Sequence, residues 1–206
     1  MLTLDEAGAV ARARTLLDQT TGRVLLGLAG SPGAGKSHLS SALARAIAGS
    51  VVVGMDGFHL AHSVLEARGD VERKGAIDTF DADGYVALLE RVREPTQRSV
   101  WAPEFRREIE DAIAGAIEVP GSARLVITEG NYLLVDQAPW LRAAELCDEV
   151  WFVAPDEDLR VDRLVSRHVA HGRDPHQARK RALEGTDGRN ARLVAETIGR
   201  ADAIIR

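Results

Sequence analysis

The sequence Gly30-Ser31-Pro32-Gly33-Ala34-Gly35-Lys36-Ser37 decides the fold, because it matches the phosphate-binding pattern G-x-x-x-x-G-K-[ST] at every fixed position. It follows the apolar run of residues 24–29, which is typical of a buried strand. It precedes Leu39, Leu43 and Ile47, which are spaced four apart, as on one face of a helix. A strand, a glycine-rich loop and a helix in this order are the context that the motif requires.

The chemistry of this loop suits a triphosphate. Its glycines let successive backbone N–H groups turn toward an anion, and the following helix adds the positive end of its dipole. Lys36 is expected to reach the β- and γ-phosphates, and the Ser37 hydroxyl is expected to bind Mg²⁺. The residues expected at the nucleotide are Gly30, Ser31, Gly33, Ala34, Gly35, Lys36, Ser37 and His38. The sequence therefore predicts binding of a nucleoside triphosphate, taken here as ATP, together with Mg²⁺.

Length and composition fit a single domain over residues 1–206, with no linker or internal repeat. The net charge of −5 argues against general binding to nucleic acid. The single cysteine, Cys147, has no partner for an internal disulfide. No apolar run approaches the roughly 20 residues that span a bilayer, and the N-terminus does not resemble a signal peptide. We therefore expect a cytoplasmic enzyme that contacts neither membrane nor nucleic acid.

Strand-like and helix-like segments alternate along the chain, which predicts an α/β fold with a mostly parallel sheet covered on both faces. Further strands are expected at residues 51–53, 124–128, 149–153 and 203–205. Helices are expected from a capping box at Thr3 to about residue 18, at 36–48, from Asp81 to Pro95, at 156–172, from Asp174 onward and at 190–200. Short strands near residues 100–101 and 116–119 indicate a β excursion from the main sheet.

Two carboxylates directly follow predicted strands. Asp56 comes after residues 51–53, and Glu129 comes after residues 124–128. Ligands of parallel α/β sheets bind outside the carboxyl ends of the strands, so both side chains are candidates for the triphosphate site. Asp56 suits the base that accepts a proton from an attacking hydroxyl, and Glu129 suits a holder of Mg²⁺ through water. Two plainer interpretations stay open: a loop aspartate capping local N–H groups, and a strand-end glutamate paired with a cation.

Arginines form a second cluster. Arg160, Arg163 and Arg167 are spaced three and four residues apart on one predicted helix, and Arg173 follows Gly172. As a lid, they would neutralise a phosphoryl group in transfer. Arg163 and Arg173 are the preferred candidates, and Arg167 is expected at the nucleotide. The alternative is a solvated helix face, because acidic residues at 156–158 and 162 compete for these arginines.

Several further segments carry a resemblance to a known family. They are Asp56-Gly57-Phe58-His59, Arg73-Lys74-Gly75, Asp78-Thr79-Phe80-Asp81, Pro103-Glu104-Phe105-Arg106, Glu129-Gly130-Asn131-Tyr132 and residues 163–174. With the phosphate loop, they make residues 24–205 resemble the P-loop kinases that include uridine kinase, phosphoribulokinase and bacterial pantothenate kinase. Asn131-Tyr132 brings the chain closer to bacterial proteins labelled nucleoside, fructose or sugar kinases.

The resemblance implies a three-layer P-loop NTPase fold with a helical lid at about 156–175 and an acceptor-binding insertion at about 57–120. It implies that the Glu129 strand lies between the strand before the phosphate loop and the strand before Asp56. It also implies that Asp56 is the catalytic base. Relatives of this kind often form dimers, which makes a homodimer an expectation as well.

The acceptor site is the least defined part of the sequence. Its expected residues are His59, Arg73, Lys74, Asp78, Arg106, Glu129 and Tyr132. Asp78 matches the position at which uridine kinases hold ribose hydroxyls, whereas Pro103-Glu104-Phe105-Arg106 replaces the Tyr and His that recognise uracil there. The main hypothesis is an ATP- and Mg-dependent kinase acting on a hydroxyl of a nucleoside, a sugar such as fructose, or a pantothenate-like metabolite. The alternatives are a nucleotide-dependent switch or chaperone-like NTPase without such an acceptor, and a nucleotide-binding protein that has lost catalysis.

Overall fold

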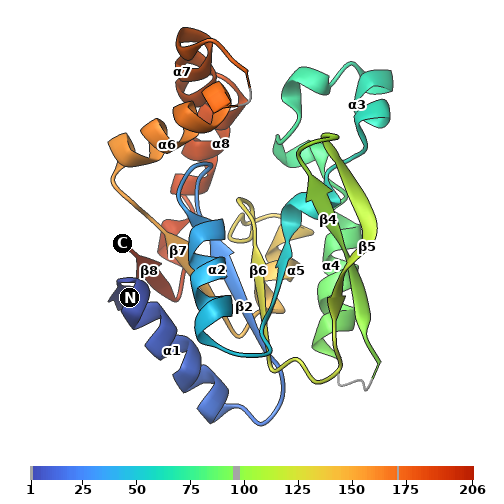
Figure 1. Ribbon diagram of the computed structural model, residues 1–206, viewed down its shortest axis with the longest axis vertical. Coiled ribbons are helices and arrows are strands. Elements are labelled where there is room, and N and C mark those ends of the chain that lie inside the picture. Colours follow the sequence, from blue (N-terminus) through green and yellow to red (C-terminus); the bar gives the residue numbers. More distant parts are fainter. Residues whose placement is uncertain (1, 95–97, 171) are drawn as a thin grey trace.

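The computed structural model describes residues 2–94, 98–170 and 172–206, and within these ranges six strands form one parallel sheet (Figure 1). The sheet contains β1 (Leu2–Leu4), β2 (Val24–Ala29), β3 (Val51–Gly54), β6 (Leu125–Glu129), β7 (Glu149–Val153) and β8 (Ala203–Ile205). Their order across the sheet is β1-β8-β7-β2-β6-β3. β6 therefore lies between β2 and β3, and the predicted position of the Glu129 strand is confirmed.

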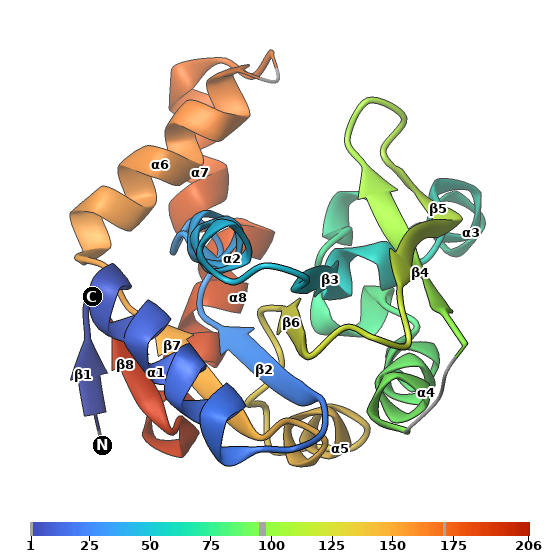
Figure 2. The same ribbon diagram turned by 60° about the horizontal axis from the view of Figure 1, so that its bottom comes forward.

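Helices cover both faces of the sheet, as Figure 2 shows, and give the predicted three layers. One face carries α1 (Glu6–Gln19) and α2 (Lys36–Ala46), and the other carries α4 (Ala82–Arg93), α5 (Trp140–Glu145) and the end of α8 (Thr186–Ala195). Two further helices, α6 (Glu157–Ala170) and α7 (Pro175–Leu183), lie with α8 beyond the carboxyl ends of the strands. Across from them lie α3 (His62–Arg68) and the antiparallel hairpin of β4 (Val100–Arg106) and β5 (Asp111–Val119).

The sheet is buried on both faces because its apolar residues alternate between two cores. Leu25 packs into the core under α4 and α5, whereas its neighbours Val24 and Leu26 pack into the core under α1 and α2. β7 repeats this alternation, with Val150 in the first core and Trp151 in the second. Burying each large side chain contributes about 1.5–3 kcal/mol, so a continuous apolar run is favourable only as a central strand.

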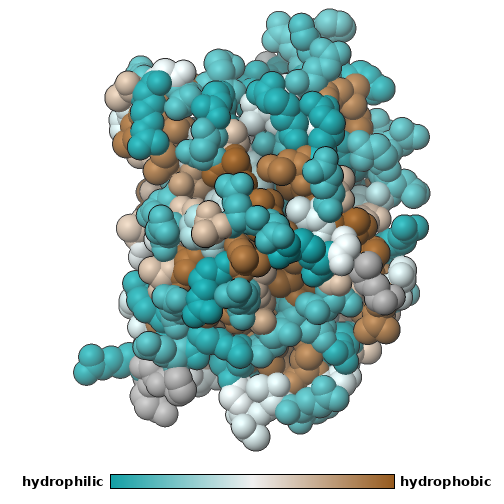
Figure 3. Space-filling view, turned by 180° about the vertical axis from the view of Figure 1, so that it is seen from behind, coloured by the Kyte–Doolittle hydropathy of each residue, from teal (hydrophilic) through white to brown (hydrophobic). Residues whose placement is uncertain are grey.

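Figure 3 shows the molecule from behind the view of Figure 1. On the face shown in Figure 3, hydrophilic side chains surround smaller apolar areas. In the described part of the chain, no helix is both long and apolar enough to cross a bilayer.

The N-terminal helix begins later than the sequence predicts. Thr3, expected as its N-cap, lies in β1 and pairs with Ile204 of β8. Asp5 caps α1 instead, and its carboxylate accepts a hydrogen bond of 2.7 Å from the Gly8 amide. Thr and Asp are both good N-caps, and the parallel pairing with β8 decides between them.

The hairpin and the last helix also differ from expectation. Two short strands were expected in the hairpin, but the pairing continues through the charged stretch, where Glu104 lies opposite Ile113. The helix expected at 190–200 is α8, which begins at Thr186 and ends at Ala195. Beyond it, the Thr197 hydroxyl donates 2.7 Å to the Val194 carbonyl, and a separate 3₁₀ turn covers Ile198–Arg200. The sequence analysis did not predict β1, α3 or α5. Pro95, the predicted end of the helix that begins after Asp81, lies outside the described residues.

Candidate active site

Two positions in the phosphate loop require glycine. Gly35 is the N-cap of α2 with φ of 103°, a left-handed conformation that favours glycine. Gly33 has φ of 83°, and a Cβ there would lie 2.7 Å from the carbonyl oxygen of Arg160 in α6. The glycines therefore serve two purposes: they shape the loop at the start of α2, and they let α6 pack directly on it.

Lys36 lies inside this loop. Its Nζ donates to the Gly30 carbonyl at 2.7 Å, to the Ser31 carbonyl at 3.3 Å and to Asn131 Oδ1 at 2.7 Å. Burial lowers the pKa of Lys36 from 10.5 to about 8, against the attraction of the Glu129 and Asp56 carboxylates. Neutral oxygens thus surround an ammonium group at the place where the motif positions a triphosphate.

The two predicted strand-end carboxylates come from neighbouring strands. Glu129 ends β6, and in the sheet it lies beside Leu28 of β2 and Gly54 of β3. Asp56 follows β3 in the 3₁₀ turn Met55–Phe58. Glu129 is mostly buried, and its Oε2 has no hydrogen-bond partner among the described residues. Burial raises the pKa of Glu129, although Lys36 and a hydrogen bond with Ser37 act in the opposite direction.

These residues fit a magnesium ion bound together with a polyphosphate. The described ranges contain no group of three His, Cys, Asp or Glu side chains that would hold a metal by themselves. Mg²⁺ commonly uses one or two protein oxygens and takes its remaining ligands from phosphates and water. The Ser37 hydroxyl and the unpartnered Oε2 of Glu129 are such oxygens. The donor set therefore suits Mg²⁺ in the presence of nucleotide.

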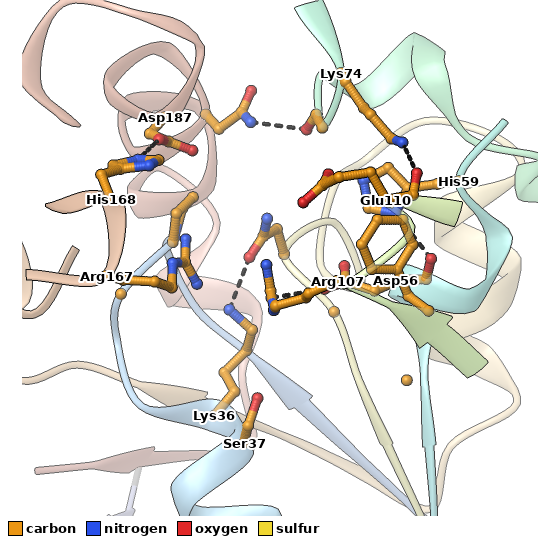
Figure 4. Close-up of a pocket in the computed structure, with 18 of the residues that line it drawn as sticks. Lys36, Ser37, Asp56, His59, Lys74, Arg107, Glu110, Arg167, His168 and Asp187 are labelled. Atoms are coloured by element: carbon orange, nitrogen blue, oxygen red, sulfur yellow. Dashed lines mark hydrogen bonds and ion pairs between the residues drawn. The ribbon is translucent and has the colours of Figure 1, made fainter. Parts of the chain in front are cut away.

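A cavity of about 800 Å³ lies above the phosphate loop. In Figure 4, Lys36 and Ser37 lie at its base, and Asp56, His59, Lys74 and Glu110 lie on one side. Arg167, His168 and Asp187 lie on the opposite side, and Arg107 projects between the two. One wall thus comes from the expected insertion and the other from the expected lid.

The insertion wall is aromatic and polar. The ring of His59 packs between Phe80 and Phe105, with centroid distances of 4.1 and 4.9 Å. Its Nδ1 donates 2.8 Å to the Asp56 carbonyl, because a carbonyl oxygen accepts and does not donate. Burial lowers the pKa of His59. Lys74 Nζ donates to the Glu110 carbonyl and lies 5.1 Å from the centroid of Phe105.

The arginines of the expected lid have different surroundings. Arg160 is 4% exposed and donates 2.8 Å to the Pro32 carbonyl, so it holds α6 on the phosphate loop. Arg163 Nη1 lies 3.4 Å from the Ala34 carbonyl at the cavity. Arg167 and Arg173 also line the cavity. The three arginines expected at the phosphates are thus gathered on one side of it.

Four residues expected at the acceptor do not line the cavity. Arg106 pairs with Glu104 on the exposed hairpin at 2.7 Å. Arg73 and Asp78 pair with each other at 2.6 Å and are about half exposed. Tyr132 is fully buried, and its hydroxyl donates 2.6 Å to the Gly75 carbonyl. Each of these side chains has a partner in the structure and none lines the cavity, so their assignment to the acceptor stays a prediction.

The remaining expected residues contribute in different ways. Those that line the cavity are Gly33, Gly35, Lys36, Ser37, His38, Asp56, His59, Lys74, Glu129, Arg163, Arg167 and Arg173. Gly30, Ser31 and Ala34 act through the loop backbone, and the Ser31 hydroxyl donates 3.3 Å to the Ala191 carbonyl of α8.

Sequence reasoning missed several residues of this cavity. Arg107 follows Arg106, and the strand pattern alone did not show which of the two turns inward. Asn131 contributes to the resemblance with bacterial sugar kinases, but its contact with Lys36 depends on the folded chain. His168 Nε2 lies 2.7 Å from Asp187 Oδ2, and this pair joins α6 to α8 across 19 residues of sequence. No local pattern would have found that pair.

The fold and the site together define a P-loop kinase with a small-molecule site. The family model described as "Phosphoribulokinase / Uridine kinase family" matches residues 25–206. The chain therefore belongs to the phosphoribulokinase and uridine kinase family, and it is a phosphotransferase that uses a hydroxyl group as acceptor.

Three individual proteins illustrate the similarity. A Schizosaccharomyces pombe protein provisionally named uridine kinase C227.14 is 37% identical over 175 residues, covering 80% of this chain and 74% of its own length. Escherichia coli K12 YggC, named as uncharacterized, is 35% identical over 190 residues, which cover 89% of this chain and 77% of the length of YggC. The crystal structure of a protein from Silicibacter sp. TM1040, provisionally named a fructose transport system kinase, has 38% identity and a TM-score of 0.84, covering 95% of this chain and 97% of that one.

Proposed function

We propose that this protein transfers the γ-phosphoryl group of ATP, with Mg²⁺, to a hydroxyl group of a small metabolite such as a nucleoside, a sugar like fructose, or a pantothenate-like compound. The proposal rests mainly on one observation. Asp56 and Glu129 stand at the ends of neighbouring strands, and the charges of both act on the Lys36 ammonium. The names of the S. pombe and Silicibacter relatives support a nucleoside or a sugar as the acceptor class.

Each residue has a role in this reaction. Asp56 accepts the proton of the attacking hydroxyl as its oxygen bonds to the γ-phosphorus, while the bond from that phosphorus to the bridging oxygen of ADP breaks. Lys36 holds the β- and γ-phosphates, and Arg163 and Arg173 neutralise the group in transfer. Ser37 and Glu129 hold Mg²⁺, which neutralises phosphate charge when bound.

The two walls of the cavity have different roles in this proposal. The expected insertion at about 57–120 supplies the acceptor side, where the partly buried His59 and the Lys74 ammonium lie near Asp56. Residues 156–175 form the lid side, where α6 packs on the phosphate loop through Arg160. An acceptor that enters between the walls would lie next to Asp56 and above Lys36, in reach of both the base and the phosphates.

A coupled assay of ADP release tests the proposal. The purified chain is given MgATP with nucleosides, pentoses, hexoses, their monophosphates, or pantothenate. We expect one class to stimulate ADP release at least about 100-fold over the acceptor-free rate, since positioning and charge neutralisation each supply large factors. If no acceptor stimulates ADP release and an added protein does, the protein is a switch-like NTPase and the proposal is wrong.

A further inference from the structure

Arg107 lies where the acceptor side meets the nucleotide side. In Figure 4 it projects from the hairpin between Asp56 on one side and Arg167 on the other, above Lys36. Its Nη2 lies 3.8 Å from Asp56 Oδ2, which is an ion pair but too long for a hydrogen bond. Among the described residues, its guanidinium donates no hydrogen bond. Several N–H donors therefore face the cavity beside the predicted base.

The hairpin is fastened on the insertion side, so the position of Arg107 is defined. At its tip, Asp111 Oδ1 accepts a hydrogen bond of 3.0 Å from the His62 amide, and Lys74 Nζ bonds to the Glu110 carbonyl. In the middle of β4, a Cβ at Gly57 would lie 2.6 Å from the Pro103 carbonyl oxygen, so β4 packs closely against the turn that carries Asp56. Arg107 and Asp56 are thus held on touching segments.

The charge of Arg107 acts on groups from every part of the site. Burial lowers the pKa of Arg167 in α6, and Arg107 is the next largest cause. Arg107 also acts on Glu129 at the end of β6 and on His59. Arg107 and Arg167 therefore face one region of the cavity from opposite walls. An anion bound between them would reduce the repulsion between the two cations.

We propose that Arg107 is a further catalytic residue, which binds the phosphoryl group in transfer from the acceptor side. The proposal rests on the proposed kinase function and adds a residue that comes from the hairpin and not from the lid. In the transition state, charge spreads over the three equatorial oxygens of that group. A planar guanidinium with several unused donors, placed beside the base and opposite Arg167, is suited to those oxygens. Arg107 would leave its loose contact with Asp56 as the phosphoryl group moves.

The test compares ground-state and transition-state ligands in calorimetry. The full chain is titrated with MgADP alone and with MgADP plus aluminium fluoride, a mimic of the planar phosphoryl group. Arg107→Ala should weaken binding of the aluminium fluoride complex about 100-fold or more while MgADP affinity stays within about threefold. Arg107→Lys should recover part of the loss, because an ammonium supplies charge without the paired donors. Arg142→Ala is the matched control, since Arg142 is similarly exposed (51% against 47%) and pairs with Glu90 on the surface.

Different results would overturn the assignment. Equal weakening of both ligands by Arg107→Ala, or no weakening of either, would mean that Arg107 does not bind the group in transfer. In steady-state assays with a stimulating acceptor, a raised acceptor KM at unchanged kcat would place Arg107 on the acceptor instead. If the unmodified protein does not bind MgADP at all, the proposed function itself fails and Arg107 loses its role with it.

Discussion

Lys36 Nζ donates to Asn131 Oδ1 at 2.7 Å, so the loop after β6 holds the lysine of the phosphate loop. The other partners of this ammonium are the carbonyl groups of Gly30 and Ser31. All three partners are neutral oxygens, and burial leaves the pKa of Lys36 at about 8. Anionic phosphate oxygens would favour the charged form of Lys36 more strongly and raise this pKa.

Binding of MgATP should therefore take up protons at alkaline pH. At pH 8.5, more than half of Lys36 is neutral in the free protein and becomes charged on binding, whereas at pH 6.5 it is charged in both states. Calorimetry in buffers of different ionisation enthalpy measures this uptake. Lys36→Arg is the control, because a guanidinium stays charged throughout this range. Equal uptake in Lys36→Arg and the unmodified protein would contradict the lysine assignment.

Replacing the predicted base should remove turnover and leave binding intact. Asp56→Asn keeps the shape of the side chain but does not accept the proton of the acceptor hydroxyl, so kcat should fall about 10²–10⁴-fold. The Kd of MgATP should change less than about threefold, because the proposed role of Asp56 is at the acceptor and its side-chain ion pair is with Arg107 and not with the phosphate loop. Asp136→Asn serves as the control at an exposed carboxylate that pairs with Arg200. An unchanged kcat in Asp56→Asn would end the assignment of Asp56 as base.

We expect the Glu129 carboxylate to destabilise the protein in the absence of nucleotide and Mg²⁺. Its raised pKa means that the environment disfavours the carboxylate, and its Oε2 has no hydrogen-bond partner in the described structure. Glu129→Gln removes that charge, so we expect the free energy of unfolding at pH 7 to rise by about 0.5–2 kcal/mol. The Mg²⁺ dependence of nucleotide binding should weaken in the same variant. Urea unfolding and magnesium titrations measure both effects, and a less stable Glu129→Gln protein would refute this account.

We expect His59 to lower the free energy of unfolding as the pH falls. Its folded-state pKa is lowered by burial, whereas the unfolded chain has the ordinary value of about 6.5. Between these values the unfolded chain binds more protons, so the free energy of unfolding falls as pH drops below about 6.5 and is unaffected by His59 well above it. The effect is at most about 1.4 kcal/mol per pH unit. Denaturant unfolding between pH 5 and 8 should show a shallower decline for His59→Gln, and an identical decline would argue against the shift.

Periodic and motif-based features could be predicted from the sequence. The run of residues 24–29 has no polar side chain, which predicts a central strand. The motif at residues 30–37 directly after it predicts a phosphate-binding loop. Asp56 and Glu129 follow such strands, and strand ends in a parallel sheet share one edge. Pro175 after Asp174 likewise marked the start of α7, where Asp174 accepts hydrogen bonds from two amides.

Features that depend on contacts distant in sequence could not be predicted. Thr3 and Asp5 are both acceptable caps, and β8, some 200 residues away, decides between them. Whether Arg106 or Arg107 faces the cavity depends on the register of the hairpin and on where its tip is anchored. Tyr132 resembled a pocket residue, but the Gly75 carbonyl and the apolar core around the ring fix it elsewhere.

Phosphorus NMR of the reaction mixture tests the central claim most directly, because it identifies the product that receives the phosphoryl group. MgATP is incubated with the protein and the acceptor that stimulates ADP release most strongly. We predict one phosphate monoester of that acceptor, formed in equal amount to ADP and at least about 100-fold more slowly with Asp56→Asn. Inorganic phosphate as the sole product beside ADP would contradict the assignment of this site to phosphoryl transfer onto a small-molecule hydroxyl.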